Sequence, residues 1–314
     1  MNECKKFLDA EIAKAIPRLR QRFRTPHQLS LAATELATSL RIIFGNIVEV
    51  IRTIKDDYGA LHVILLQQTV NFKKSMDFYL PMVNRLIAFA AATQGATVCP
   101  PLMSSVKSDY CNDKVHHSTD GVMRLFAVHH KMNNYLRKLL VNQDITATAL
   151  TDVLLEVVER KTPPPPSSRF GERIPKIEDF FYENYLLSPA KKYVCIKTKN
   201  TQEPYRFSER DFPWLSVTIT DSMYRAAVAK LPTRRRFNRH GSAVAISPGA
   251  SYAHWAQNLK EYAPIRQCQN KAAIFYVALG TNDAFFLEKR LKTLFKRLNP
   301  RQQRGGRRNT QQRC

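Results

Sequence analysis

This chain is short of acidic residues. It has 26 Asp and Glu residues against 49 Lys and Arg, which gives a formal net charge of +23 over 314 residues. Such an imbalance destabilises the folded state through self-repulsion and is typical of proteins that have a polyanionic partner. Nucleic acid is the best candidate, because each phosphate that a cation neutralises releases a condensed counterion.

The chain also lacks paired cysteines and long apolar runs. No two of its six cysteines form a CxxC pair, which argues against a disulfide framework and favours a reducing compartment. The longest apolar stretches, near residues 61–66 and 86–92, are too short to cross a bilayer, so we expect no membrane partner. An amphipathic helix over residues 5–24 leaves open a membrane-surface helix, a nucleic-acid arm or a plain solvated helix.

Several functional motifs are missing as well. There is no phosphate-binding loop of the P-loop ATPases, no zinc finger, no RRM signature and no helix-turn-helix pattern, so sequence-specific base reading is not expected. One group of metal-ligand residue types is close in sequence: Cys111, His116, His117, His129 and His130. Neighbouring histidines on a helix point about 100° apart and zinc needs four converging ligands, so we predict neither a metal site nor a cofactor.

One segment resembles a motif of a known class of enzymes. ALGTND, at Ala278–Asp283, resembles a block of the serine esterases that use Gly, Asn and Asp. Such an enzyme needs a nucleophilic serine in an early Gly-Asp-Ser turn and a late Asp-x-x-His, and neither is present. We therefore interpret the segment as a strand–turn–helix junction and predict no catalytic residues.

Residues 1–161 are predicted to form a helical domain. The apolar stripe from Leu29 to Ile54 recurs at steps of three and four, which indicates one long helix that Ser30 caps. Further helices are expected over residues 61–79, where Pro81 ends or kinks the helix, and over 86–93, 119–141 and from Thr146 onward.

Residues 162–175, with four consecutive prolines, are predicted to be an extended linker. Residues 176–298 are expected to form a smaller α+β domain, with strands in KKYVCIK, PWLSVTIT and KAAIFYVAL and a last helix from Asn282 or Asp283 to Leu298. The tail, 299–314, has no apolar side chain beyond Cys314 and is predicted to be disordered. The fold class is thus mostly α with a smaller α+β part.

The positive charge is gathered in three clusters. Arginine forks suit bidentate phosphate contacts, and an RGGRR run is typical of segments that bind nucleic acid with little sequence preference. One cluster is Arg18, Arg20, Arg22 and Arg24. The candidate nucleic-acid-binding residues come from the other two: Arg234, Arg235, Arg236 and Arg239, and Lys289, Arg290, Lys292, Lys296, Arg297, Arg301, Arg304, Arg307 and Arg308. The alternative for any one cluster is a solvated face or a nuclear-import signal.

Four segments appear in an order that resembles the adenovirus 52/55-kilodalton encapsidation protein family. They are LLQQTVNFKKS (Leu65–Ser75), RLFAVHHKMNNYLRKLLVN (Arg124–Asn142), LTDVLLEVVERK (Leu150–Lys161) and YRAAVAKLPTRRRFNRHG (Tyr224–Gly241). The resemblance implies a non-enzymatic late protein of the host nucleus or immature virion. Its expected partners are a packaging ATPase, core and capsid proteins and double-stranded DNA.

We therefore expect a binding protein, with homo-oligomerisation left open, that bridges nucleic acid and proteins during viral genome packaging. The alternatives are a basic virion or nucleocapsid protein that coats nucleic acid, and a nucleic-acid enzyme with unrecognised metal-binding acids.

Overall fold

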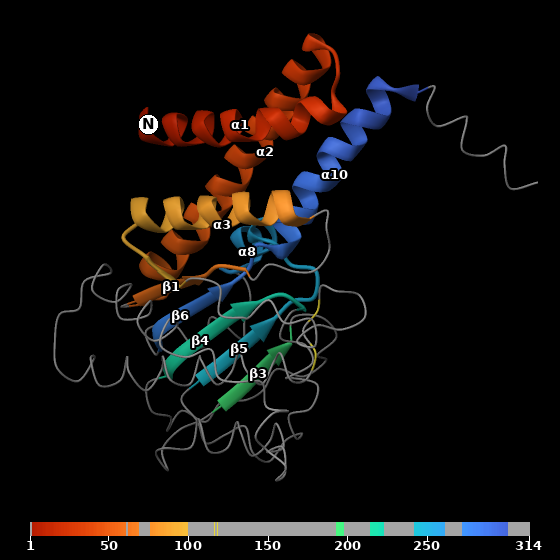
Figure 1. Ribbon diagram of the computed structural model, residues 1–314. Helices are drawn as coiled ribbons and strands as arrows, with labels where there is room; N and C mark the ends of the chain where they lie inside the picture. The colour runs from red at the N-terminus through yellow and green to blue at the C-terminus, as the bar shows by residue number, and fades with distance from the viewer. Residues whose placement is uncertain are drawn as a thin grey trace, which may run out of the picture.

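The structure is a computed structural model of the chain. It describes residues 2–60, 62–68, 76–99, 116, 118, 193–197, 214–222, 242–260 and 272–300. Helices account for most of these residues, and a parallel sheet accounts for much of the rest (Figure 1).

The sheet has six strands among the described residues, in the order β2-β1-β6-β4-β5-β3. All of the pairings that join them are parallel. The strands are β1 (His62–Leu66), β2 (Thr97–Cys99), β3 (Tyr193–Lys197), β4 (Trp214–Thr220), β5 (Ser242–Ile246) and β6 (Ala272–Ala278). The four inner strands are therefore β1, β6, β4 and β5, which come from distant parts of the chain.

β1 and β6 are buried on both faces, as parallel strands normally are. Val63, Val217 and Phe275 belong to the main hydrophobic core on the helical side. Ile64 and Tyr276 alternate with them and are also buried. A continuous run of apolar residues, rather than an alternating one, is the sequence pattern that this arrangement produces.

The helical layer begins with α1 (Asn2–Arg22) and α2 (Pro26–Arg52). Thr25 caps α2, because its hydroxyl accepts a hydrogen bond from the N–H of Gln28. Proline has no backbone N–H, and Pro26 fits the first turn because a helix makes no internal hydrogen bond to the N–H group at that position. α2 runs on into a π-helical turn, η1 (Thr53–Asp57). The hydroxyl of Tyr58, just after this turn, donates to the carbonyl oxygen of Leu259 at 2.7 Å.

The described residues add three more helices to the layer: α3 (Met76–Thr93), α8 (Tyr252–Asn258) and α10 (Thr281–Leu298). α2 contacts α1, α3, α8 and α10, so it is the central helix of the layer (Figure 1). The helical run Pro26–Asp57 is long and apolar enough to cross a membrane by length and composition alone. Its apolar stripe, including Leu36, Ile43 and Ile47, is buried in the core, which is how a core helix is used.

The structure confirms several predicted elements. The long helix at Leu29–Ile54 is present, although its cap is Thr25 rather than Ser30. Strands occur in KKYVCIK, PWLSVTIT and KAAIFYVAL, and the last helix spans Thr281–Leu298. The mostly helical fold class is also correct for the described residues.

Other expectations are wrong. Residues 1–161 are not purely helical, because β1 and β2 lie within them. The span expected to be a helix at 61–79 contains strand β1 and, at its end, the first turn of α3. Of the two alternatives for Pro81, ending the helix is wrong, because Pro81 lies inside α3. β1 pairs with β6, so the described parts of 1–161 and 176–298 share one sheet. The linker 162–175, the helices at 119–141 and from Thr146, and the tail beyond residue 300 lie outside the described residues.

Candidate functional site

The carboxyl ends of the parallel strands bring polar residues from distant segments to one edge of the sheet. β4 ends at Thr220 and is followed by Asp221 and Ser222, while the neighbouring strand β6 ends at Ala278, just before Asn282. Thr220 Oγ1 donates to the carbonyl oxygen of Ala278 at 3.2 Å and ties the two strand ends together. This edge is where parallel α/β sheets commonly bind ligands.

At this edge a serine meets a histidine. Ser222 Oγ lies 3.0 Å from His116 Nε2, although 106 positions separate the two residues in sequence. Both side chains are partly exposed, so a ligand could reach the pair. A serine hydroxyl within hydrogen-bond distance of an imidazole is the arrangement of an activated nucleophile and its general base.

Asn282 contacts Asp221, the residue before Ser222. Its Nδ2 donates to Asp221 Oδ2 at 3.0 Å and to the carbonyl oxygen of Ala250 at 2.8 Å. The side chain therefore lies between the end of β4 and the turn that leads into α8. These two bonds use both N–H groups of the amide, so Asn282 holds Asp221 and the turn before α8 in place and has no donor left for a ligand.

Asp283 links the two helices that begin at this edge, α8 and α10. It is buried, and its Oδ2 accepts a hydrogen bond from the N–H of Tyr252 at 3.2 Å, which joins the start of α10 to the start of α8. Burial, together with the charge of Asp221, raises the pKa of Asp283 to about 7, although the N–H of Tyr252 acts in the opposite direction. Asp283 is thus a structural anchor that exchanges a proton near neutral pH.

A second serine–histidine contact lies at the end of β5. Ser247 Oγ is 3.2 Å from His254 Nε2. Ser247 is 1% exposed, whereas Ser222 is partly exposed. A nucleophile must reach its substrate, so Ser222 is the better candidate and Ser247 is a useful internal control.

A buried hydrogen-bonded group closes the edge on the β1 side. Asn84 accepts from the N–H of Gln68 at 2.8 Å and donates to the Gln68 carbonyl at 2.6 Å. Thr281 Oγ1 donates to Gln68 Oε1 at 3.1 Å. These bonds fix the start of α10, and with it Asn282, against α3 and β1.

The predicted nucleic-acid-binding residues are only partly described. Lys289, Arg290, Lys292, Lys296 and Arg297 lie on α10 and are all exposed. Two of them pair with acids: Arg290 with Glu35 at 2.5 Å and Lys292 with Glu288 at 2.6 Å. The remaining candidates lie outside the described residues and stay predictions: Arg234, Arg235, Arg236, Arg239, Arg301, Arg304, Arg307 and Arg308.

The described residues hold no group of three or more His, Cys, Asp or Glu side chains that could bind a metal. Of the histidines and cysteine weighed as metal ligands, His116 alone is described, and it faces Ser222.

Sequence reasoning missed the Ser222–His116 pair, although two signals were present. One is the sequence Thr220-Asp221-Ser222, which differs from Gly-Asp-Ser in its first residue. The other is an Asp-x-x-His motif at Asp113–His116. The second motif precedes the serine instead of following it, so a search in the usual order overlooks it. No family model matches the chain, and no curated protein or solved structure matches it either.

Proposed function

We propose that this protein is a serine-dependent acyl hydrolase, with Ser222 as the nucleophile and His116 as its general base. The observation that carries this proposal is the 3.0 Å contact between Ser222 Oγ and His116 Nε2 at the carboxyl edge of a parallel sheet. The esterase-like Gly280-Thr281-Asn282-Asp283 block lies at the same edge and supports it.

In this mechanism Ser222 Oγ attacks the carbonyl carbon of an ester while His116 takes the hydroxyl proton. The backbone N–H of Ser222 stabilises the oxyanion of the tetrahedral intermediate. His116 then returns the proton to the departing alcohol, which leaves an acyl-enzyme. Water then attacks the acyl group while His116 takes its proton. His116 gives this proton to Ser222 Oγ as the bond to the acyl group breaks, which releases the carboxylic acid and regenerates the free serine.

Asp113 is the natural third member of the proposed set. It stands three positions before His116 in the sequence, the spacing of the Asp-x-x-His motif, and a carboxylate there would orient the imidazole. Its own position lies outside the described residues, so this role rests on sequence spacing alone. The three motifs of such an esterase would then occur in a rotated order along the chain, with Asp-x-x-His first.

The decisive experiment measures hydrolysis of p-nitrophenyl acetate and covalent labelling by a fluorophosphonate. Ser222→Ala should abolish labelling and lower kcat by at least about 1,000-fold, because the nucleophile is gone. Ser247→Ala is the matched control, since it removes the other histidine-contacting serine, and it should retain both signals. Labelling that survives Ser222→Ala, or wild-type protein without any turnover, would refute the proposal.

A second candidate function is nucleic-acid binding, which the net charge of +23 and the exposed cations of α10 favour. Fluorescence polarisation with unrelated duplexes and single strands should give similar affinities and a steep negative salt slope. Binding that does not respond to salt would contradict this function. Both functions can coexist in one chain, because they use different residues.

The role in viral genome packaging, with a packaging ATPase as partner and the nucleus as location, remains a further proposal. It rests on the four ordered motifs and on the charge. Of those motifs, the described residues reach only the start of the first, Leu65–Gln68.

A further inference from the structure

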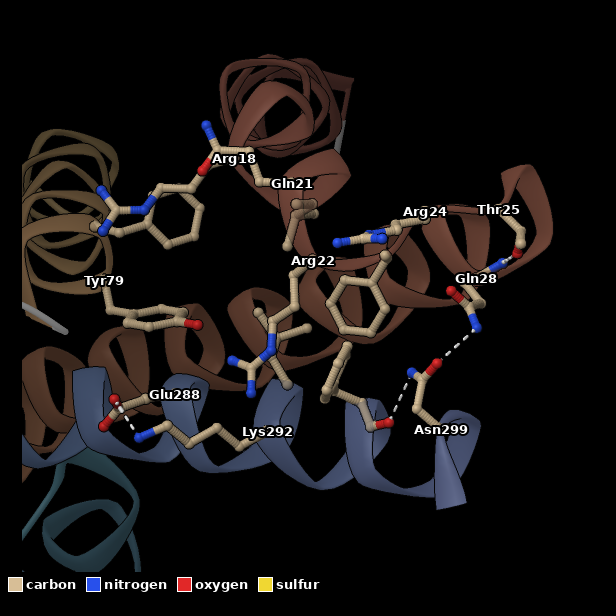
Figure 2. Close-up of a pocket in the computed structure, with 15 residues that line it drawn as sticks. Arg18, Gln21, Arg22, Arg24, Thr25, Gln28, Tyr79, Glu288, Lys292 and Asn299 are labelled. Atoms are coloured by element: carbon tan, nitrogen blue, oxygen red, sulfur yellow. Dashed lines mark hydrogen bonds and ion pairs between the residues drawn. The ribbon is translucent and has the colours of Figure 1, made fainter. Parts of the chain in front are cut away.

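A cavity of about 560 Å³ opens between the end of α1 and the side of α10 (Figure 2). The start of α2 and the first turn of α3 complete its wall. Its volume falls within the roughly 300–1,000 Å³ typical of ligand sites. It is built from the helical layer and contains none of the residues of the serine site.

The cavity brings together two basic clusters that are far apart in sequence. Arg18, Arg22 and Arg24 come from the first cluster, and Lys292 comes from α10. Among the described residues that line it, Glu288 is the one acid, and it pairs with Lys292 at 2.6 Å. The four cations against one carboxylate leave a net excess of three positive charges, which calls for an anionic ligand.

Two of the three arginines in the cavity stack on aromatic rings. The guanidinium carbon of Arg22 lies 4.5 Å from the centroid of Phe295, and that of Arg18 lies 5.1 Å from the centroid of Phe78. Across the described parts of the chain, no carboxylate forms an ion pair with Arg18, Arg22 or Arg24. Stacking leaves the N–H edge of a guanidinium available, and that edge matches a phosphate.

Neutral donors line the same space. Burial, with a smaller contribution from Glu288, raises the pKa of Tyr79 despite the nearby Arg22 and Arg18, so its hydroxyl stays protonated. In Figure 2 the Tyr79 hydroxyl points toward Arg22. At the other end, Gln28 Nε2 donates to Asn299 Oδ1 at 3.3 Å.

Positive charge continues out of the cavity along α10. Lys289, Lys292 and Lys296 follow one another at steps of three and four, which places them on one side of the helix, and all three are exposed. At 1.5 Å per residue they extend over about 10 Å. A ligand with several phosphates in a row would use this line of charge, whereas a single free anion would not.

We propose that this cavity binds the phosphate backbone of a nucleic-acid strand, with Arg22 and Arg24 as its main contacts. The inference rests on the second proposed function, nucleic-acid binding, and gives that function a site. It is independent of the proposed hydrolase activity.

The test compares two double variants that change the charge equally. Arg22→Gln with Arg24→Gln removes cavity cations, while Arg20→Gln with Arg41→Gln removes exposed cations that do not line the cavity. Binding of the full chain to a fluorescein-labelled single-stranded oligonucleotide is measured across a salt series. The cavity variant should bind about tenfold more weakly, with a salt slope shallower by about 1.4 units for two lost phosphate contacts, and the control should stay within about twofold.

Each outcome is informative. Equal losses in the two variants mean that only net charge matters and overturn the site, while nucleic-acid binding itself stands. No binding by the wild type refutes the proposed function and the site with it. Displacement of the oligonucleotide by inorganic phosphate at matched ionic strength, with the same dependence on Arg22 and Arg24, identifies a free-anion site and overturns the strand assignment.

Thermal melting of both variants excludes loss of folding as the cause of weaker binding. The variant Arg22→Lys with Arg24→Lys should bind at an intermediate level, because it keeps the charge but loses the two parallel N–H donors of each guanidinium.

Discussion

At the scale of single residues, Gly280 is a position that only glycine fits. It precedes α10 with φ of +129°, and an added Cβ would lie 3.1 Å from Ile87 Cδ1 and 3.2 Å from Gln68 Cγ. We expect Gly280→Ala to lower the free energy of unfolding by about 1–3 kcal/mol, because it adds backbone strain to these contacts.

The matched control is Gly45→Ala. Gly45 lies inside α2, and a Cβ there meets nothing within 4 Å. This substitution should stabilise the protein by about 0.5–1 kcal/mol, because alanine loses less backbone entropy in a helix. Urea unfolding of the two variants measures both values, and equal effects would contradict the strained geometry at Gly280.

Asp283 should make stability depend on pH in an unusual direction. Its pKa is raised from 3.8 to about 7 in the folded state, so between these values the folded protein holds a proton that the unfolded chain releases. Stability therefore falls as pH rises through this window, by up to about 4 kcal/mol for a shift of roughly three pKa units.

The measurement is urea unfolding of wild type and Asp283→Asn at about pH 5 and about pH 8. The asparagine can still accept the Tyr252 N–H bond, so the variant should lose less stability between the two pH values. Asp56→Asn, at an exposed site, controls for the change in net charge and should behave like wild type. An unchanged pH dependence in Asp283→Asn would refute the assignment.

At the scale of elements, α1 is fastened to α3 through a buried carboxylate. The Glu11 side chain is 2% exposed and accepts from Arg85 at 2.7–3.0 Å and from Lys14 at 2.9 Å. Burial alone would raise the pKa of Glu11, but these hydrogen bonds and positive charges outweigh it and lower the pKa. The stabilisation is therefore present at neutral pH and is lost as the pH falls through the lowered pKa.

We expect Arg85→Met to destabilise the protein by about 2 kcal/mol, because Glu11 would stay buried with one partner fewer. Arg85 is 44% exposed, and solvent screening reduces the cost from that of a fully buried pair. Lys14→Met should cost less than about 1 kcal/mol, since Lys14 is 61% exposed. Chemical denaturation compares them, and a larger loss in Lys14→Met would show that Arg85 is not the main anchor.

At the scale of the whole molecule, the sheet joins the two ends of the chain. β1 lies between β2, from the same segment, and β6, which is more than 200 positions further on. A fragment of residues 1–161 would keep strands β1 and β2 but would lack β6, which pairs with β1 in the full chain. A sheet of two strands is only marginally stable by itself. We expect neither residues 1–161 nor residues 176–314 to unfold cooperatively when expressed alone, as followed by circular dichroism.

The full chain, measured in parallel, should show one cooperative transition. A fragment 1–161 that melts as sharply as the full chain would contradict the shared sheet and restore the two-domain interpretation.

The sequence by itself determined the elements whose pattern is local. The apolar stripe of α2, the β-branched strand β4 and the start and end of α10 follow from periodicity and from residue type. The residues His62–Leu66 misled the prediction, because a short apolar run fits a buried helix as well as a strand. Only pairing with β2 and β6 decides between them, and that pairing is not visible in the segment itself.

The candidate sites depended on tertiary structure for the same reason. Ser222 and His116 are 106 positions apart, and Arg22 and Lys292 are further apart still, so no local pattern brings either pair together. The basic clusters were visible in the sequence as charge, but their convergence on one cavity was not. Residue type and helical periodicity are local properties that neighbouring positions in the sequence reveal. A nucleophile beside its base, or a cavity lined by cations, depends on contacts between distant segments, which the parallel pairing of distant strands and the packing of distant helices decide.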